Sequence, residues 1–494
     1  MPMRGWISDM LARNTAIPRD GADVLNYVFP NQWSFLLGEI ALYCFVMLLI
    51  SGIALMFYFT PSHQIVVYHG PYKPLDGATM TAAYDSAMRL SFQVRGGLLM
   101  RQVHHWAALV FLGAIVIHMG QIYFTGAYRR PRRANWIVGV TLLGAAMLNG
   151  YLGHSMIYDQ VAGTGVQIGY SILESIPIIG TYAAVMLFQG NFPGSGIFIL
   201  RFYVLHVFLF PAIIVALLGA HFFLAYRSRP SQFPGPFRRS NNIVGSALWP
   251  THLTKSIALF FLTSSVLFFL GAVVQINPIW AYGPFHAFRQ TDAVQPDWYI
   301  GWLEGALRIW PSWEINFPGH MIPEQFWPGI FLPGMTFFTL WTLPFWDRWL
   351  SGDKREHHVL IRPREHPGRT GFGAAMLMFY AILFFAGGDD VLAHYFGVSQ
   401  FAIVWFFRAS LVVAPFVAYG LTWKICRELG SSPIVTERQR HLLVVRSSDG
   451  AFSLRDVPVR ADRVGAAPIR LRDGAPPDLS LHNGPPATRE GNSP

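Results

Sequence analysis

Long apolar runs dominate the chain and recur at the length of a membrane crossing. A bilayer core about 30 Å thick is spanned by about 20 apolar residues in a helix. Eight runs reach or approach that length, at residues of about 34–59, 98–125, 136–157, 199–226, 255–275, 325–346, 372–387 and 401–424. The pattern predicts an all-α, polytopic membrane protein with eight transmembrane helices, of which the seventh is the shortest.

Composition supports a bilayer as the solvent of this chain. Of its 494 residues 52% are hydrophobic and only 13% are charged, whereas soluble proteins carry about 25% charged residues. The net charge of +10 does not indicate nucleic-acid binding, because the basic residues cluster in short segments between the apolar runs. Such clusters orient membrane helices.

The charge of the loops alternates along the chain. Four arginines follow the second expected helix at residues 129–133, and the loops after the fourth and sixth helices are also basic. The loop at 387–400 contains no Lys or Arg. Positive charge marks the cytoplasmic side, so we expect a protein of the cell membrane with the even-numbered loops and both termini in the cytoplasm.

These features predict four regions. Residues 1–33 form a cytoplasmic or interfacial segment without a signal-peptide pattern, 34–230 a bundle of four helices, and 231–424 a second four-helix region with a long outward loop. Residues 425–494 form a basic tail that is expected to be poorly ordered or a small docking segment. The two cysteines form no CxxC motif, so no iron–sulfur centre or c-type haem is expected on this chain.

Four histidines lie inside the second and fourth expected helices. His118 follows His104 by fourteen residues, and His221 follows His206 by fifteen. Fourteen residues are close to four helical turns and rise about 21 Å. Both helices run from outside to inside, so His104 is expected level with His206 near the outer surface, and His118 with His221 near the inner one.

Ionisable residues inside a membrane helix are costly and usually functional. Two stacked histidine pairs predict two bis-histidine sites, each able to hold one haem b through both axial positions. The alternative is that these histidines only form hydrogen bonds between helices. His105 lies about 100° around the helix from His104 and is expected not to be a ligand.

Glycines and arginines extend this pattern. Two pairs of glycines repeat at the same fourteen-residue interval, where a haem edge would require a residue without Cβ; they are Gly38 with Gly52 and Gly139 with Gly153. Arg101 and Arg201 precede the outer histidines by three and five residues. They are candidates to pair with haem propionates, and the alternative is interfacial arginines that extend toward water.

The spacing of these histidines, arginines and glycines resembles cytochrome b of the cytochrome bc complex, over residues of roughly 20–430. The Pro-Asp-Trp-Tyr segment at 296–299 is similar to the Pro-Glu-Trp-Tyr motif of that family. Three longer strings resemble the actinobacterial branch: QFPGP at 232–236, QINPIW at 275–280 and EGALRIWPSWE at 304–314.

The resemblance implies a quinol:cytochrome c oxidoreductase subunit of a respiratory chain, a translocase. Menaquinol would be oxidised at the outer face, with one electron passing to a Rieske iron–sulfur subunit. The other would cross through two haems b to a quinone at the inner face. Further implied partners are a c-type cytochrome subunit, a terminal cytochrome c oxidase and a second copy of the chain.

For the outer quinol site the resemblance implies the segment 153–165 and the Pro-Asp-Trp-Tyr segment. Asp297 is the candidate general base or proton carrier, with Tyr299 and Glu304 beside it, and the alternative is that Asp297 caps a helix. Ile157 stands where many relatives have proline.

The inner quinone site is harder to assign from the sequence. Ser256, after Lys255, stands where many relatives have an aspartate, and Tyr226 where some have a histidine. His252 is a candidate substitute proton donor, or an ordinary interfacial histidine.

Two other classes of protein are alternatives to a quinol oxidoreductase subunit. A transporter with a histidine and arginine relay predicts interrupted helices around one midplane site, which the two separated histidine pairs do not favour. A haem-containing membrane anchor of another oxidoreductase needs no outer quinol pocket, so the Pro-Asp-Trp-Tyr segment argues against it.

Overall fold

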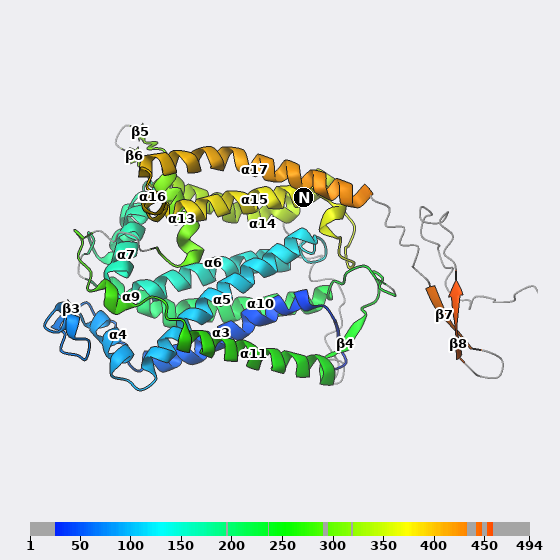
Figure 1. Cartoon of the computed structure of the whole chain (residues 1–494), viewed down its shortest axis with the longest axis horizontal. Coiled ribbons are helices and arrows are strands. Elements are labelled where there is room, and N and C mark those ends of the chain that lie inside the picture. Colours follow the sequence, from blue (N-terminus) through cyan, green and yellow to red (C-terminus); the bar gives the residue numbers. More distant parts are fainter. Residues whose placement is uncertain are drawn as a thin grey trace, which may run out of the picture. The chain divides into compact units, whose positions relative to one another are not determined.

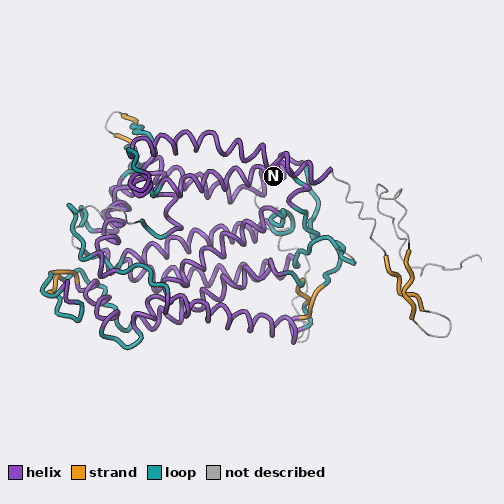
Figure 2. Tube along the Cα trace, viewed as in Figure 1, coloured by secondary structure: helices purple, strands orange, loops and turns teal. Residues whose placement is uncertain are grey.

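A computed structural model describes residues 25–193, 196–235, 237–289, 295–317 and 320–431, together with two strands of the tail. The chain divides into one unit that ends at Ser431 and a second at Ser432–Pro494. Most of the predicted segment 1–33 and most of the predicted tail lie outside the described residues. Figure 1 labels the elements along the chain, and Figure 2 shows that the first unit is almost entirely helical.

The first half of this unit is a bundle of four long helices. Its helices are α3 (Leu36–Met56), α5 (Gly97–Phe124), α6 (Arg133–Ser155) and the continuous run of α9 (Phe198–Val204), the π turn η3 (Leu205–Leu209) and α10 (Phe210–Ser228). In a bilayer every backbone N–H and C=O needs an internal partner, so long apolar runs become helices. Figure 1 shows these helices side by side.

The second half adds helices against this bundle. They are the π turn η4 (Leu248–His252), α11 (Leu253–Val273), α12 (Ile279–Tyr282), α13 (Trp298–Ile309), the π turn η5 (Trp327–Phe331), α14 (Leu332–Ser351), α15 (Pro367–Ala386), α16 (Asp389–Phe396) and α17 (Gln400–Ser431). Helix α11 packs on α3 and α5, and α15 packs along α17. Trp136 of α6 donates a 2.6 Å hydrogen bond to the carbonyl of Leu340, which joins the bundle to α14.

Within the described residues, seven of the eight expected spans are helices long and apolar enough to cross a membrane. The seventh expected span, α15, begins at Pro367 and is longer than the sequence pattern suggested. The sixth expected span is also helical. Its helix, α14, covers residues 332–351 instead of 325–346 and is less apolar than the other seven. Residues 327–331 form a π turn, and Pro344, Asp347 and several threonines and tryptophans dilute α14.

Short elements join the helices at their ends. The chain between α3 and α5 forms β2 (Ile65–Val67), η2 (Lys73–Leu75), β3 (Thr79–Thr81) and α4 (Ala82–Phe92). Two further helices follow α6, namely α7 (Gln160–Glu174) and α8 (Gly180–Phe188). Remaining short elements are η1 (Trp33–Phe35), η6 (Pro363–Glu365) and the strands β1 (Val28–Pro30), β4 (Gly245–Ala247), β5 (Ile315–Phe317), β6 (His320–Ile322), β7 (His441–Arg446) and β8 (Phe452–Val457). The strands form the antiparallel pairs β1–β4, β2–β3, β5–β6 and β7–β8.

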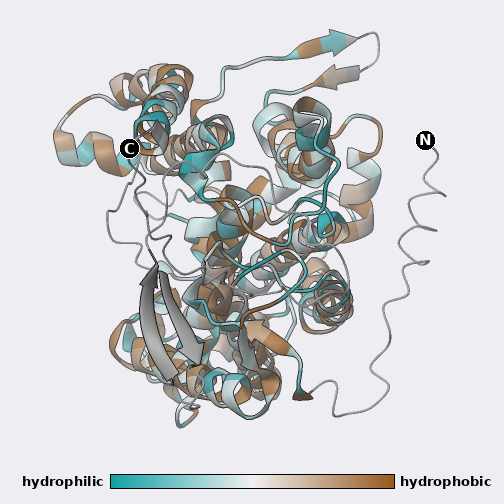
Figure 3. Ribbon diagram, turned by 90° about the vertical axis from the view of Figure 1, so that its right-hand side faces the viewer, coloured by the Kyte–Doolittle hydropathy of each residue, from teal (hydrophilic) through white to brown (hydrophobic). Residues whose placement is uncertain are grey.

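The helices pack through small residues and expose large apolar ones. Cys44, Val103 and Ala107 are fully buried where α3 and α5 meet. On the outside of the helices Phe223 and Phe416 are 55% and 78% exposed. Figure 3 shows hydrophobic residues along the helices and hydrophilic ones mostly in the connecting segments. Such an exposed apolar surface fits contact with lipid.

Candidate functional site

The two outer histidines face each other across the bundle. The ring centroids of His104 on α5 and His206 in η3 are 6.2 Å apart, with an interplanar angle of 77°. Metal–imidazole bonds are about 2 Å long, so this separation admits one metal atom between two ring nitrogens. His206 lies in a π turn, a local distortion that is frequent at functional sites.

Hydrogen bonds determine which ring nitrogens of this pair are free. His206 Nδ1 donates to the carbonyl of Asn149 at 2.9 Å. The Ser51 hydroxyl donates to the carbonyl of Met47 at 2.6 Å, so Ser51 Oγ accepts from His104 Nδ1 at 2.9 Å. Both rings therefore carry their proton on Nδ1 and leave Nε2 as an acceptor, which is how metal-binding histidines are normally oriented.

The two inner histidines also come together. His118 of α5 and His221 of α10 lie close enough for their charges to interact. His118 Nδ1 is buried and has no hydrogen-bond partner in the part of the chain that the structure describes. A buried polar atom without a partner is costly, which is consistent with a ligand site more than with a helix-to-helix hydrogen bond.

Each of the four predicted glycines lies against one imidazole ring. A Cβ on Gly52 would lie 3.3 Å from Cε1 of His104, and a Cβ on Gly153 would overlap the ring of His206. The four contacts are Gly38 with His118, Gly52 with His104, Gly139 with His221 and Gly153 with His206. The absence of Cβ therefore makes room for the histidine rings themselves. The spacing had suggested that it makes room for a haem edge.

Arg101 and Arg201 differ in their surroundings. Arg101 is buried and donates to the carbonyl of Asn277 at 3.1 Å. Its Nε and second terminal nitrogen have no hydrogen-bond partner among the described residues. It lines the same cavity as His104, so it can receive an anionic group. Arg201 donates to the carbonyl of Met186 and is not part of that lining.

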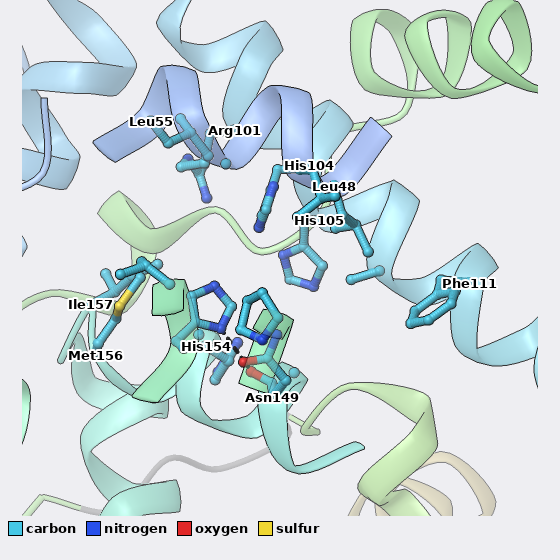
Figure 4. Close-up of a pocket in the computed structure, with 18 of the residues that line it drawn as sticks. Leu48, Leu55, Arg101, His104, His105, Phe111, Asn149, His154, Met156 and Ile157 are labelled. Atoms are coloured by element: carbon cyan, nitrogen blue, oxygen red, sulfur yellow. Dashed lines mark hydrogen bonds between the residues drawn. The ribbon is translucent and has the colours of Figure 1, made fainter. Parts of the chain in front are cut away.

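One cavity joins the outer histidine pair to the Pro-Asp-Trp-Tyr segment. Its lining includes His104 and His206 together with Asp297 and Tyr299. Figure 4 shows His104, His105 and His154 around this space, with Met156 and Ile157 at its edge. A ligand in the cavity would therefore contact both the outer histidine site and the candidate base.

Asp297 occupies the N-cap position of α13, but its side chain makes no capping hydrogen bond within the described residues. The carboxylate instead accepts from His105 Nε2 at 2.8 Å, and His154 Nδ1 lies 3.9 Å from its other oxygen. The helix-cap alternative is thus not the role of this side chain. The contacts of these two histidines with Asp297 were not predicted from the sequence; the His-His pair at 104–105 and the histidine next to Gly153 were the available signals.

The electrostatics of this cluster keep Asp297 ionised. Burial raises the pKa of Asp297, but the hydrogen bond from His105 and the electrostatic interactions with His105 and His154 outweigh burial and lower the pKa below the usual value. Burial, followed by the nearby charge of Asp297, raises the pKa of Tyr299 well above its usual range. The cavity therefore presents one carboxylate acceptor beside one neutral phenol.

Glu304 lies on the same helix, but the structure does not bring it into this cavity lining. Its Oε1 accepts from Arg308 Nε at 3.1 Å and from a terminal nitrogen at 2.7 Å. Arg308 also donates to Asp389 at 2.5 Å. Burial raises the pKa of Glu304, and Arg308 opposes that effect. Glu304 therefore belongs to an ion-pair network that joins α13 to α16.

The beginning of the segment 153–165 lines the cavity, through Gly153, His154, Met156 and Ile157. Helix α6 ends at Ser155, and α7 begins at Gln160 after a turn in which Tyr158 has a positive φ of 62°. Asp159 caps α7 by accepting from the backbone of Val161 and Ala162. Ile157, where proline was expected from relatives, lines the cavity within this turn.

Comparisons with known proteins bear directly on this geometry. Residues 109–284 match the family model described as cytochrome b(N-terminal)/b6/petB. Cytochrome b subunits of the cytochrome bc1 complex from Streptomyces coelicolor and Mycobacterium tuberculosis are 44% and 45% identical to this chain over 403 residues, which cover 81% of this chain and 73% of theirs. The subunit from Corynebacterium efficiens is 43% identical over 402 residues, covering 81% of this chain and 74% of that protein.

This chain belongs to the family of cytochrome b subunits of the cytochrome bc1 complex. A solved structure, a hyperthermophilic respiratory Complex III, superposes with a TM-score of 0.58 over 84% of this chain and 99% of that chain. At 20% identity this likeness shows the shared fold. The predicted family resemblance and its actinobacterial branch are confirmed, and they argue against the transporter alternative.

Cytochrome b proteins carry haem b, and the histidines of this chain suit that cofactor. The orientation of His104 and His206 and the free donors of Arg101 are observations that a bound haem would explain. The family assignment and the geometry of these residues therefore agree.

The structure locates the four residues considered for the predicted inner quinone site. Ser256 Oγ donates to Glu39 Oε2 at 2.7 Å, and His252 Nε2 lies 3.1 Å from Glu39 Oε1. Lys255 lies 3.5 Å from Asn31 Oδ1, and the Tyr226 ring packs against Tyr27. The sequence analysis did not single out Glu39, although an acidic residue inside the run LLGEIALY was a signal for it.

Proposed function

We propose that this cytochrome b subunit oxidises menaquinol in the cavity shared by Asp297 and the outer histidine pair, and sends one electron inward through two haems b. The observation that carries the proposal is this shared cavity, because quinol oxidation requires a proton acceptor and an electron acceptor at one substrate. As a member of its family the chain is part of a quinol–cytochrome c reductase, a respiratory electron-transport complex.

Asp297 would act as the proton acceptor. Its carboxylate is ionised, lies in the cavity and is oriented by the 2.8 Å hydrogen bond from His105. A quinol hydroxyl within hydrogen-bond reach would pass its proton to the free oxygen of Asp297, and His154 at 3.9 Å would then receive it. Tyr299, a neutral phenol in the same lining, would position the quinol by a hydrogen bond.

The four membrane histidines would hold the haems. His104 and His206 would hold the outer haem and His118 and His221 the inner one, with Arg101 receiving a propionate. When bound, the haems would supply one-electron redox chemistry. Arg201 remains a predicted second propionate partner, and the glycines Gly38, Gly52, Gly139 and Gly153 keep the imidazoles in place.

The remaining assignments concern the complex around the chain. The second electron of quinol would leave to a Rieske iron–sulfur subunit and a c-type cytochrome subunit, consistent with the lack of CxxC motifs here. A terminal cytochrome c oxidase and a second copy of this chain are further proposed partners. The positive loops favour the plasma membrane with both termini in the cytoplasm.

An absorption spectrum of the purified complex tests this function directly. Addition of a short-chain menaquinol should produce the α band of reduced haem b, with about two haems b per chain by pyridine haemochrome analysis. A chain that carries no haem b, or haem that quinol fails to reduce although dithionite reduces it, would refute the proposal.

A further inference from the structure

We propose that Glu39 delivers the protons that reduce quinone at the inner face, within a cluster formed with Tyr43, His252 and Ser256. The inference deepens the proposed function and rests on it, because it assigns the proton donor of the second quinone site. The carboxylate comes from α3, whereas Ser256 at the beginning of α11 contributes only a hydroxyl.

Two hydrogen bonds and a nearby histidine nitrogen converge on the Glu39 carboxyl group. Oε2 accepts from Ser256 at 2.7 Å and from Tyr43 at 3.2 Å, and Tyr43 and Ser256 also contact each other. Oε1 lies 3.1 Å from His252 Nε2. A carboxyl group so held has a defined position, which proton transfer to a bound substrate requires.

The cluster borders the inner histidine pair. Gly38, the residue before Glu39, lies against the ring of His118, with 3.5 Å between its ideal Cβ position and Cε1. Glu39 therefore directly follows the residue of α3 that contacts His118, a proposed ligand of the inner haem. A quinone in contact with Glu39 would be near the group that supplies its electrons.

His252 lies beside Glu39 at the end of the bundle that the loop charges assign to the cytoplasm. Glu39 and His252 are 21% and 15% exposed. The ring of Phe29 stacks on His252 at a centroid distance of 4.2 Å, and the β1–β4 pairing holds Phe29 opposite Ser246. His252 thus contacts the Phe29 ring and the Glu39 carboxyl group.

The other side of the cluster opens onto apolar surface. On α11, Ile257 and Phe261 are 48% and 62% exposed, and the Phe260 ring packs against Tyr43 at 5.5 Å. A polar group bordered by lipid-facing side chains suits a ligand with a polar ring and an apolar tail. A membrane quinone has that chemistry.

The proton balance of the step is simple. Reduction of one quinone takes two electrons, which the proposed electron transfer through the haems supplies, and two protons. For each proton, the O–H bond of the Glu39 carboxyl group breaks as an O–H bond forms on a quinone oxygen. The carboxylate left behind is protonated again from the cytoplasm through His252, so Glu39 ends the cycle unchanged.

The test follows the inner half-reaction in the purified complex. The b haems are reduced beforehand, the outer site is blocked with an inhibitor, and a short-chain menaquinone is added. We expect Glu39→Gln to slow haem reoxidation by about 100-fold, in the range of a positioned general acid. Moving the carboxylate, with Ser256→Asp in the Glu39→Gln background, should recover most of that loss.

Glu174→Gln is the matched control. Glu174 accepts a 2.7 Å hydrogen bond from Tyr170, four residues away, as Glu39 does from Tyr43. The control should reoxidise at the wild-type rate. In a redox-difference infrared spectrum the carboxyl band that changes on quinone reduction should be absent from Glu39→Gln and present in the control.

The outcomes separate this inference from the proposed function. Quinol-driven haem reduction at the outer site, with the inner site inhibited, should be unchanged in Glu39→Gln; failure of that reaction in the wild type would overturn the proposed function. Wild-type reoxidation in Glu39→Gln would overturn the present inference alone. If Glu39→Gln does not assemble, Ser256→Ala should shift the same infrared band, and an unshifted band would contradict the role of Glu39.

Discussion

At the scale of single residues, the protein uses histidine for two different tasks on one helix. His104 has its Nδ1 engaged by Ser51 and its other nitrogen free. The next residue, His105, directs Nε2 to Asp297. A turn of about 100° between neighbours separates a candidate metal ligand from a residue that orients a carboxylate.

The ligand assignment predicts a selective loss of haem. His118→Ala should remove about half of the haem b, because one of two sites loses an axial ligand, whereas His105→Ala should retain the full amount. Pyridine haemochrome analysis of both purified variants measures this. Equal haem in wild type and His118→Ala would disprove the assignment.

The glycine contacts predict different costs at equivalent positions. A Cβ at Gly153 overlaps the His206 ring, whereas at Gly139 it lies 3.6 Å from the nearest atom of His221. Gly153→Ala should lower the free energy of unfolding by about 1–3 kcal/mol, as overpacking does, and weaken haem retention. Gly139→Ala should be close to neutral. Thermal unfolding followed at the haem band compares them, and equal effects would argue against the ring contact.

At the scale of elements, α13 joins the outer cavity to an ion-pair network. Its N-terminus presents Asp297 to the cavity, and two turns later Glu304 pairs with Arg308. Arg308 in turn reaches Asp389, which is 1% exposed, at the beginning of α16. The position of Asp297 therefore depends on contacts far from the cavity.

This network predicts a structural role for Glu304. Removing one partner of a buried ion pair typically costs about 3–5 kcal/mol, so Arg308→Met should strongly lower thermal stability. Glu304→Gln should lower stability less and keep the quinol oxidation rate within about twofold. A large loss of rate in Glu304→Gln with unchanged stability would instead place Glu304 in the proton path.

Whether a contact could be predicted from the sequence depends on how far apart its residues lie along the chain. The histidine pairs and their glycine partners were predictable because helical periodicity places residues fourteen apart on one face. The contacts of Asp297 with His105 and of Glu39 with Ser256 join residues 192 and 217 positions apart. Periodicity indicates which residues share a face, but not which helix that face meets.

At the scale of the whole molecule, the number of membrane crossings decides on which side of the membrane the C-terminal region lies. Seven helices qualify as spans by length and hydropathy in the described residues, whereas the loop charges require eight crossings. Apolar residues at 327–331 belonged to the expected span but form a π turn. Helix α14 packs on α6 beside the bundle, which favours a crossing despite its polar residues.

Single-cysteine labelling resolves this count. If α14 crosses, a cysteine at Gly352, after its last residue, should react only from the cytoplasmic side. A cysteine at Gly397, between α16 and α17, should react only from outside. The native Cys44 and Cys426 are buried, so background labelling should be low. Labelling of Gly352→Cys from outside would leave seven crossings.

The most direct test of the account is the rate of quinol-driven b-haem reduction, with the inner site inhibited, in Asp297→Asn. We expect this rate to fall by about 100-fold, with haem content and the reduced spectrum unchanged. The matched control is Asp76→Asn, which removes another aspartate–histidine pair, with His69 at 3.1 Å, away from the cavity. A wild-type rate in Asp297→Asn would contradict the assignment of Asp297 as the proton acceptor.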